Sequence, residues 1–531
     1  MRVVTAAEMR SLEEAAFARG VEAPALMQQA GAGVARVIRE IVGIGVGVGS
    51  GVGHTGARIV VLLGPGNNGG DGVVAARTLA SDGFHVSVWS LTPRADAEGA
   101  NHQGLSALES DDALRAALGE ADIVLDAILG TGARPGLPAN IAAVTKMVNT
   151  VTPRAARVVA LDIPTGVDAT TGEASDDAII AHVTATLGSP KRGCLVPPGS
   201  RYAGRIVVVD LGLGEPSDAG PRMTTDDDVR QRIPRRLADA HKSDCGTLLV
   251  VAGAVTYVGA PGFVAEAAMR AGAGLATMAV PRAIAGTVSS AVREATLVPL
   301  PDDIERAGKL LREWMQRFTA AVIGPGLGRE EETEHFLARL LGIGEARARP
   351  QLGFGGTSQS ASRDSILPGS LPLLIDADGL NWLSGVERWW EQISNPTILT
   401  PHPGEMARLT KREPAEIKRQ PWQIATEFAD QWQKVVVLKG GPTIVAAPGG
   451  ALWVAPGGNP ALATAGTGDV LAGIIGGFLA QGLSPLDAAI CGVHVGSRAA
   501  ERAADAVGVY GMVAPDLLPH IAYAMRDIMG V

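Results

Sequence analysis

Residues 459–480 read NPALATAGTGDVLAGIIGGFLA, a glycine-rich turn that leads into a long apolar helix. The N–H groups of such a turn point at whatever lies before the helix, and the helix dipole favours negative charge there. This stretch therefore predicts an anion site. Asp469 falls in the first helical turn, where its carboxylate could take a proton from a hydroxyl group that attacks a phosphate. The alternative is that Asp469 only complements the helix dipole.

Four more turns at predicted strand ends accompany this stretch in the second half of the chain. They are VIGPGLG at 322–328, LIDADGLN at 374–381, TPHPGE at 400–405 and LKGGPT at 438–443. In a parallel α/β sheet the carboxyl ends of the strands meet at one edge, where ligands bind. Lys439 and backbone groups near it could hold nucleotide phosphates there. His402 lies between two prolines, which predicts a stiff exposed turn, although a lone histidine is usually structural.

Together these segments resemble the ribokinase-like fold and, more narrowly, the ADP- or ATP-dependent NAD(P)H-hydrate dehydratase family. The resemblance covers residues 235–531, apart from 342–370, and departs from the family at Ser243, Cys245 and Gly379. It implies that Asp469 is the catalytic base and that Mg²⁺ accompanies ADP or ATP. The residues implied to contact the hydrate are Ala260, Gly326, His402 and Asp469. The residues implied to bind the nucleotide are Lys439, Gly440, Gly441, Pro442, Thr443 and Gly468.

The first half of the chain also alternates strand-like and helix-like segments. A helical pattern over residues 6–39 precedes the apolar run RIVVLL at 58–63, which GPGNNGGDG follows at 64–72. A helix is expected over 73–82. The runs DIVLD at 122–126 and VVALD at 158–162 each end in an aspartate and a turn. Short apolar runs that end in polar loops and are separated by helices predict an α/β fold with a parallel sheet buried on both faces.

Asn68, Asp126 and Thr165 follow three of these strands and offer oxygen atoms. Such a set suits a weakly held hard cation better than zinc, which favours His or Cys ligands. Asp162 adds a carboxylate that could move a proton in the same crevice. Each aspartate taken alone could equally be a helix N-cap or a turn former.

These segments resemble the NAD(P)H-hydrate epimerase family over residues 1–215, including SPKRGC at 189–194, which is similar to the family's lysine-containing segment. The resemblance implies a Rossmann-like fold and an acid/base role for Asp162. The implied potassium ligands are Asn68, Asp126 and Thr165. The residues implied to contact the hydrate are Asn67, Asn68, Gly69, Gly70, Asp71, Gly130, Thr131, Gly132, Ala133, Arg134, Pro135, Gly136 and Asp162.

Length and composition bound the remaining possibilities. The 531 residues exceed one ordinary core, and the polar, Pro/Gly-marked segment 212–235 separates predicted domains at 1–215 and 235–531. Residues 342–370 read as a surface insertion, whereas the glycine-valine tract at 43–56 matches no expected feature.

With 46 Lys and Arg against 55 Asp and Glu, the net charge of −9 disfavours general binding of nucleic acid or anionic membrane. Three dispersed cysteines without a CxxC pair, and no apolar run near 20 residues, fit the cytoplasm.

The two halves therefore point to one metabolite, and together they resemble a bifunctional NAD(P)H-hydrate repair enzyme. The resemblance implies that the first domain interconverts the R and S epimers of hydrated NADH and NADPH (NADHX and NADPHX). The second domain dehydrates the S form at the expense of ADP or ATP. We also expect a homo-oligomer. The rival hypothesis is a ribokinase-like small-molecule kinase with a noncatalytic N-terminal binding module.

Overall fold

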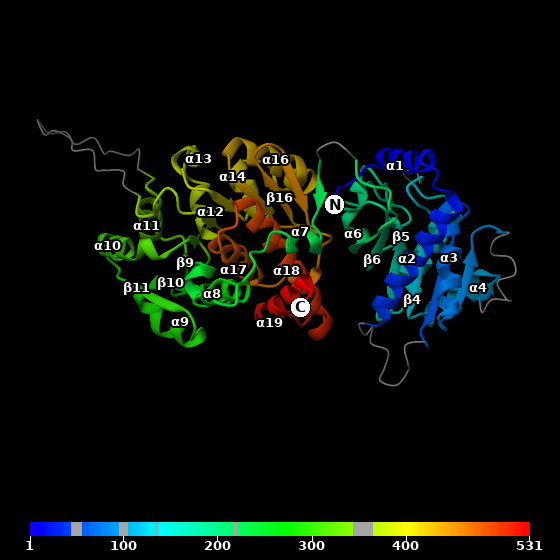
Figure 1. Cartoon of the computed structure of the whole chain (residues 1–531), viewed down its shortest axis with the longest axis horizontal. Helices are drawn as coiled ribbons and strands as arrows, with labels where there is room; N and C mark the ends of the chain where they lie inside the picture. The colour runs from blue at the N-terminus through cyan, green and yellow to red at the C-terminus, as the bar shows by residue number, and fades with distance from the viewer. Residues whose placement is uncertain (44–55, 95–104, 133–135, 217–219, 344–364, 531) are drawn as a thin grey trace, which may run out of the picture. The chain divides into compact units, whose positions relative to one another are not determined.

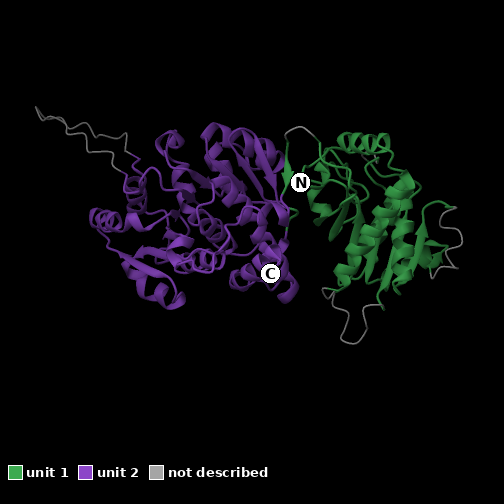
Figure 2. Cartoon of the chain, viewed as in Figure 1, with its two compact units in different colours: residues 1–223, 456–458 green, residues 224–455, 459–531 purple. Residues whose placement is uncertain are grey.

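The computed structural model describes residues 1–43, 56–94, 105–132, 136–216, 220–343 and 365–530. The chain divides into two compact units (Figure 2). The first consists of Met1–Met223 with Pro456–Gly458, and the second of Thr224–Ala455 with Asn459–Val531. The limits 1–215 and 235–531 stay predictions about pieces that fold independently. Most of the expected insertion at 342–370 and of the tract at 43–56 lies outside the described residues.

The first unit is built on a parallel sheet with the strand order β3-β2-β1-β4-β5-β6-β7. Its strands are β1 (Arg58–Leu63), β2 (His85–Ser90), β3 (Leu105–Leu108), β4 (Ile123–Ala127), β5 (Arg157–Leu161), β6 (Val183–Leu187) and β7 (Arg205–Val209). The order reverses direction at β1, so the loops after β1 and β4 flank the switch point, where ligands bind in open α/β sheets.

Helices cover both faces of this sheet, and their bounds are α1 (Ala6–Ala18), α2 (Ala23–Gly43), α3 (Asn67–Ser81), α4 (Asp111–Gly119), α5 (Ala139–Val151) and α6 (Ser200–Ala203). Alternate residues of β1 belong to two cores. Val61 packs with α2 and α3, and Val60 packs with α4 and α5. Figure 1 shows α2 and α3 side by side. Successive side chains of a strand point to opposite faces of the sheet, so a strand that is apolar throughout packs against helices on both faces. This gives the three-layer arrangement.

Two helices of this unit differ from the sequence prediction. The helix expected over residues 6–39 is interrupted between α1 and α2, where Gly20 has a φ of +91°. The helix expected over 73–82 begins six residues earlier, at Asn67, so the NNGGDG segment is helix rather than loop. Glycine is needed here for close packing, because a Cβ atom at Gly72 would lie 2.6 Å from Ala127 Cβ.

The second unit contains a larger sheet with the order β11-β10-β9-β12-β13-β14-β15-β16-β17. Its strands are β9 (Thr247–Val251), β10 (Leu275–Pro281), β11 (Thr296–Leu300), β12 (Ala320–Ile323), β13 (Leu373–Ile375), β14 (Thr397–Leu399), β15 (Val435–Leu438), β16 (Ile444–Ala447) and β17 (Ala451–Val454). The strands from β11 to β15 are parallel, and β16 and β17 continue the sheet as antiparallel neighbours. The short strand β8 (Arg222–Met223) ends the main segment of the first unit.

The helices of the second unit again cover both faces of its sheet. Their bounds are α7 (Asp226–Arg230), α8 (Ala260–Arg270), α9 (Ala285–Ala291), α10 (Ile304–Trp314), α11 (Glu331–Leu341), α12 (Asp378–Leu383), α13 (Trp389–Gln392), α14 (Pro403–Thr410), α15 (Pro414–Arg419), α16 (Pro421–Trp432), α17 (Thr467–Ala480), α18 (Pro485–Val507) and α19 (Ala514–Met529). The main core joins α8, α17, α18 and α19 to one face. Figure 1 shows α16 and α18 on opposite sides of β16. The predicted α/β class with parallel sheets is confirmed.

None of the helices built from the described residues combines the length and the apolarity that a membrane crossing requires.

Candidate functional sites

Asp126 and Thr165 meet at the carboxyl ends of β4 and β5. Both are fully buried, and the hydroxyl of Thr165 donates to Asp126 Oδ1 at 2.7 Å. The Thr165 N–H donates to Asp126 Oδ2 at 2.8 Å, and the Ile128 N–H donates to Oδ1 at 3.2 Å. Burial raises the pKa of Asp126 to about 6, although the bonds from Thr165 and Ile128 oppose this shift. A nearby cation would relieve the cost of charging this carboxyl.

Asn68 lies in the first turn of α3 and faces the loop that follows β4. A Cβ atom at Gly130 would lie 3.1 Å from Asn68 Oδ1. Next to Gly130, the Leu129 N–H donates to Thr165 Oγ1 at 3.1 Å. Among the described residues, Asn68 Nδ2 is buried without a hydrogen-bond partner. The structure thus pairs Asp126 directly with Thr165 and places Asn68 against the neighbouring loop.

Asp162 follows β5 in an unusual backbone conformation, with a φ of +71°. Such a conformation is uncommon outside glycine, and functional sites are enriched in it. Its N–H donates to Ala185 O at 2.9 Å, and its Oδ1 accepts from the Leu187 N–H at 3.1 Å. The ammonium of Lys191, whose side chain is 1% exposed, also donates to Asp162 Oδ1. Lys191 lies in the SPKRGC segment but was not predicted as a site residue.

Two further carboxyl groups share the surroundings of Asp162. Burial, with the charges of Asp162 and Glu13, raises the pKa of Asp71 to about 8. Burial is also the main cause that raises the pKa of Glu13, and Asp162 adds to it while Lys191 opposes it. Asp71 therefore keeps its proton at neutral pH, while Asp162 faces an ammonium group. Pairs of carboxyls in such different environments are typical of acid/base sites. Glu13 lies on α1, outside every motif that the sequence contains, so it could not be predicted.

The other predicted residues of the first unit lie in three segments. Asn67, Gly69 and Gly70 form the start of α3. Gly130, Thr131 and Gly132 lie in the loop after β4, and Gly136 lies before α5. Ala133, Arg134 and Pro135 lie outside the described residues.

In the second unit, α17 begins at the turn that the sequence singled out. Its N-cap, Gly466, has a φ of +85°, and a Cβ atom there would lie 3.0 Å from Ala514 Cβ. A left-handed conformation with so little space favours glycine. Asp469 lies in the first turn of the helix, as predicted. Burial, followed by the charge of Asp376, raises the pKa of Asp469 to about 7, and Lys439 opposes the shift. This value suits a general base that works near neutral pH.

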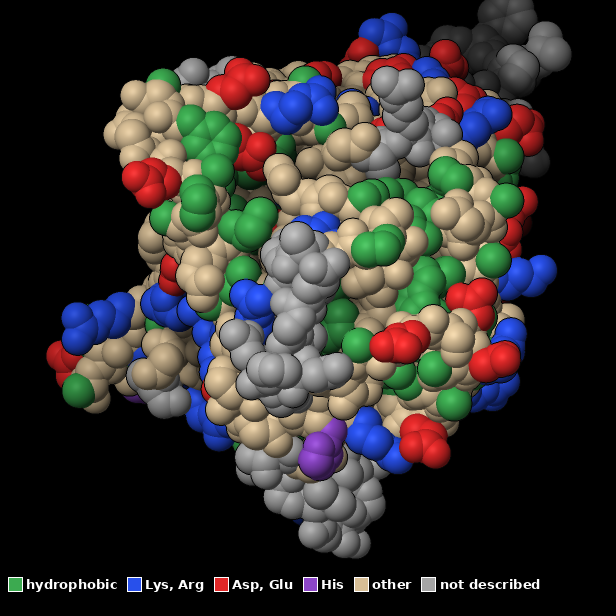
Figure 3. Space-filling view, turned by 90° about the vertical axis from the view of Figure 1, so that its right-hand side faces the viewer, with side chains coloured by type: hydrophobic (Ala, Val, Ile, Leu, Met, Phe, Trp, Pro, Cys, Tyr) green, Lys and Arg blue, Asp and Glu red, His purple; other side chains and the backbone are tan. Residues whose placement is uncertain are grey.

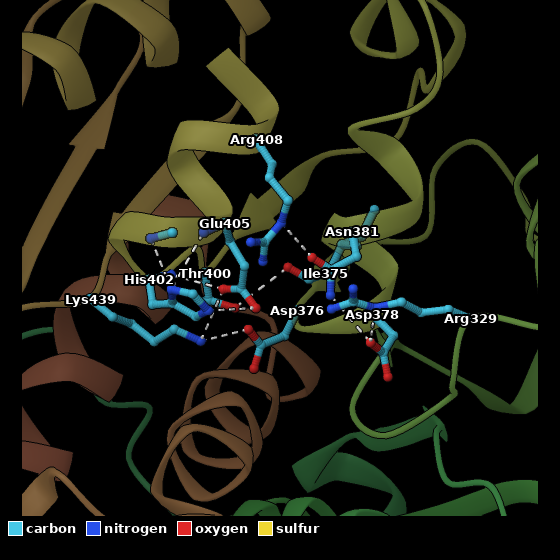
Figure 4. A network of polar contacts seen from close by, with 11 residues as sticks. Arg329, Ile375, Asp376, Asp378, Asn381, Thr400, His402, Glu405, Arg408 and Lys439 are labelled. Atoms are coloured by element: carbon cyan, nitrogen blue, oxygen red, sulfur yellow. Dashed lines mark hydrogen bonds and ion pairs between the residues drawn. The ribbon is translucent and has the colours of Figure 1, made fainter. Parts of the chain in front are cut away.

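Lys439 lies in the turn after β15, and its ammonium lies close to the start of α17. Its Nζ lies 2.8 Å from Asp376 Oδ1 and 3.8 Å from Glu405 Oε2 (Figure 4). A Cβ atom at Gly468 would lie 3.6 Å from the same Nζ. Burial lowers the pKa of Lys439, but the charges of Asp376, Glu405 and Asp469 together outweigh burial and raise it. The lysine therefore carries its charge beside the N-terminus of α17.

The rest of the predicted nucleotide loop forms the turn between β15 and β16. Gly440, Gly441 and Pro442 lead to Thr443, whose hydroxyl donates to Gly440 O at 3.1 Å. Asp376 and Glu405 were not predicted as site residues. The sequence does contain a signal for both, because they lie in DADGLN and TPHPGE, two segments that it predicts to be turns at strand ends.

His402 is the N-cap of α14, and its side chain is 50% exposed. Its Nδ1 accepts from the Gly404 N–H at 3.0 Å, so the N–H of the neutral ring is at Nε2. Burial, Lys439 and Arg408 lower the pKa of His402, which keeps the ring neutral. The His402 N–H donates to Glu405 Oε2 at 2.8 Å. Burial raises the pKa of Glu405 to about 7, although Lys439 opposes this shift.

Gly326 and Ala260 are neighbours, although they are 66 positions apart in the sequence. A Cβ atom at Gly326 would lie 3.1 Å from Ala260 Cβ and 2.7 Å from Tyr257 Cβ. Ala260 is the first residue of α8, and Phe263 of the same helix packs against the Gly466 turn. Through α8, Ala260 and Gly326 therefore lie next to the start of α17.

Comparisons with known proteins cover both units. The family model described as NAD(P)H-hydrate dehydratase (Carb_kinase) matches residues 248–522, and the YjeF-related protein N-terminus model matches residues 23–193. The bifunctional NAD(P)H-hydrate repair enzyme Nnr of Moorella thermoacetica is 36% identical over 99% of this chain and 97% of its own length. The corresponding enzyme of Salinibacter ruber is 37% identical, with the same shares covered.

Among solved structures, the ADP/ATP-dependent NAD(P)H-hydrate dehydratase of Bacillus subtilis, co-crystallised with ATP/Mg²⁺, is 28% identical. It matches with a TM-score of 0.48 and covers 58% of this chain and 98% of its own. The full-length similarity to the curated relatives decides the family. The chain belongs to the family of bifunctional NAD(P)H-hydrate repair enzymes.

Proposed function

We propose that this chain repairs hydrated NADH and NADPH in two steps. The first unit interconverts the R and S epimers, and the second dehydrates the S form at the expense of ADP or ATP. One observation carries the proposal. A chain that matches both families along its length holds, in each unit, a carboxylate near a lysine at the carboxyl edge of the sheet: Asp162 with Lys191, and Asp469 with Lys439.

In the second unit, Asp469 takes the proton of the hydrate's hydroxyl group while the hydroxyl oxygen attacks the terminal phosphorus of the nucleotide. ADP is thereby converted to AMP, or ATP to ADP. The ring nitrogen's electron pair helps to expel phosphate, which leaves more readily than hydroxide, and loss of a proton from the adjacent carbon restores the dihydropyridine. The N–H groups at the start of α17 and the ammonium of Lys439 stabilise the negative charge on the phosphates.

Mg²⁺ fits this arrangement as a partner of the nucleotide. It binds phosphate oxygens and a few carboxylates, and it neutralises charge during phosphoryl transfer. The carboxylates of Asp376 and Glu405 lie beside the proposed phosphate position. Within the described part of the chain, no three His, Cys, Asp or Glu side chains converge into a protein-only metal site.

In the first unit, the hydroxyl group lies on the carbon next to the ring nitrogen. Epimerisation of the hydrate requires a bond at that carbon to break and to form again, with proton transfer at oxygen or nitrogen. Asp162 is the proposed group that moves this proton, and Lys191 fixes its position. Potassium fits the oxygen atoms of Asn68, Asp126 and Thr165, because Asp126 is a fully buried carboxyl whose hydrogen-bond partners, among the described residues, are the neutral groups of Thr165 and Ile128. It would help to hold the hydrate in place.

We also propose a cytoplasmic location and a homo-oligomeric state. Cys194 and Cys491 are buried free thiols, which supports a reducing compartment. Tyr510 and Val513 are exposed apolar residues of the second unit, which supports self-association. The face drawn in Figure 3 carries acidic and basic side chains interspersed, which supports small molecules rather than nucleic acid as ligands.

The direct test adds purified protein to hydrated NADH with ATP and Mg²⁺ and follows the near-ultraviolet absorbance of the dihydropyridine. We expect the absorbance to return in proportion to the ATP consumed. ATP consumption with a hydroxymethylpyrimidine or a sugar, without any recovery of absorbance from the hydrate, would instead show a small-molecule kinase.

A further inference from the structure

Two arginines of the second unit are joined by a polar network beside the proposed hydrate site (Figure 4). Arg329 lies in the loop between β12 and α11, and its Nε donates to Asp378 Oδ1 at 3.4 Å. Arg408 lies on α14, and its Nε donates to Asn381 Oδ1 at 3.0 Å. Asn381 in turn donates from Nδ2 to Asp378 Oδ1 at 3.2 Å. We call Arg329, Asp378, Asn381 and Arg408 the rim network.

The rim network is attached to the loop of Gly326. The Gly328 N–H donates to Asp378 Oδ2 at 3.0 Å. Arg408 approaches His402 on the other side, because a Cβ atom at Gly404 would lie 3.8 Å from Arg408 Nη1. The charge of Arg408 also contributes to the lowered pKa of His402. The two arginines therefore flank the two proposed hydrate contacts, Gly326 and His402.

Charge and exposure suit this network to an anion. The rim network contains two guanidinium groups and one carboxylate: Arg329 pairs with Asp378, whereas Arg408 bonds to the amide oxygen of Asn381. The charge of Arg408 also lowers the pKa of the neighbouring Glu405. The Arg329 side chain is 66% exposed, and Arg408 is exposed as well, whereas the Asp378 side chain is 15% exposed. The bonds within the network use the Nε atoms, and a guanidinium fork with its two Nη atoms matches phosphate oxygens.

Along the sheet, the residues of this network and the proposed nucleotide turn follow different strands. Arg329, Asp378 and Arg408 follow β12, β13 and β14, whereas the Lys439 turn follows β15 at the far end of that series. The hydrate is itself a dinucleotide, and it carries a pyrophosphate and, in NADPHX, a 2′-phosphate. The rim network lies on the side of Gly326, where the hydrate is proposed to bind.

We infer that Arg329 and Arg408 bind a phosphate group of the hydrated dinucleotide and thereby determine the affinity of the second site for its substrate. This inference rests on the proposed function, because it takes Gly326 and His402 as hydrate contacts. It adds a recognition role for two side chains to the proposed chemistry at Asp469.

The test compares Arg329→Gln, Arg408→Gln and the double variant with wild-type protein in the absorbance assay. KM is measured for S-NADHX, for S-NADPHX and for ATP. In the double variant we expect the KM for hydrate to rise about tenfold or more, because charge-assisted bonds to phosphate are lost. The KM for ATP and kcat should change by less than about twofold, as for an interaction made equally in the ground and transition states. Arg408→Lys keeps the charge without the fork and should give an intermediate KM.

The matched control is Arg339→Gln, which removes another surface arginine, paired with Glu305 on the neighbouring α10. It should leave every KM unchanged. An equal rise for both hydrates would identify the pyrophosphate as the ligand, and a rise for NADPHX alone would identify the 2′-phosphate.

A hydrate KM within twofold of wild type in the double variant would overturn the inference. So would an equal rise in the KM for ATP, because the arginines would then bind the nucleotide. A fall in kcat and in melting temperature without a change in KM would overturn it too, by showing a structural role. Wild-type protein that restores no absorbance would instead refute the proposed function.

Discussion

Lys439→Met tests how the candidate dehydratase site is held together. Methionine keeps most of the length and the apolar stem of lysine but removes the ammonium. In the wild type, this ammonium lies between the carboxylates of Asp376 and Glu405, whose side chains are 2% and 6% exposed. At 2.8 Å the gross attraction to Asp376 is about 6 kcal/mol at an effective dielectric constant of 20. Desolvation offsets much of this, and unpairing a buried ion typically costs about 3–5 kcal/mol.

The cost of this substitution should depend on pH in a defined direction. Glu405 has a folded-state pKa of about 7, above the usual 4.5, so its ionisation opposes folding as the pH rises. Lys439 lowers that pKa, and its loss should raise it further. We therefore expect the variant to lose about 3–5 kcal/mol of unfolding free energy at pH 8 and clearly less at pH 5, where Glu405 is protonated in both proteins.

Urea unfolding at pH 5 and pH 8 measures this difference, with ATP binding recorded in parallel. ATP affinity should fall, because the ammonium lies beside the α17 N-terminus. Lys411→Met is the matched control, since Lys411 is exposed and donates to Ser384 O. Adding Asp376→Asn to Lys439→Met should recover part of the lost stability. Equal losses at both pH values, or no recovery in the double variant, would refute the proposed charge arrangement.

Three further predictions concern the first unit and the domain division. Asp126→Ala should abolish the response of epimerisation to potassium; an unchanged potassium titration would remove the proposed cation site. Asp71→Asn should raise the unfolding free energy by about 1–3 kcal/mol at pH 8 and not at pH 4, because the raised pKa of Asp71 makes its ionisation costly in the folded state. Urea unfolding measures this difference, and equal gains at both pH values would contradict it. Pieces 1–215 and 230–531 should each unfold cooperatively by calorimetry, and loss of cooperativity in both would show a shared core.

The fold class could be predicted from the sequence, because few folds other than a parallel α/β sheet fit apolar runs that end in polar turns. The start of α3 was wrong by six residues, since glycine-rich segments have low helix propensity. The structure shows that the glycine at position 72 is required by close contact with β4 rather than by a loop. Tertiary packing of this kind overrides local propensity and cannot be read from one segment.

Site residues in contiguous motifs could be predicted from the sequence, whereas those defined by contacts between distant segments could not. Asp469 was found because its turn and its helix are contiguous in the sequence. Lys191 and Glu405 lay inside recognised motifs, but their pairing with Asp162 and Lys439 depends on contacts between distant loops. Glu13 had no signal, because its effect on Asp71 arises only when α1 folds near α3.

Two separable activities on one chain predict a distinctive time course of NADH recovery from mixed hydrates. The substrate is a mixture of R and S hydrates with excess ATP and Mg²⁺, and the protein is the Asp162→Asn variant. We expect absorbance to recover quickly until the S form is consumed. It should then continue only at the spontaneous rate of epimerisation, because a positioned acid/base contributes about 10²–10⁴.

The same mixture with Asp469→Asn should show exchange between the epimers and dehydration slowed by about the same factor. Biphasic recovery with Asp162→Asn, reaching an amplitude equal to the S fraction, is the predicted result. Complete recovery at the wild-type rate, or no recovery from folded protein, would contradict the division of the two activities between the two units.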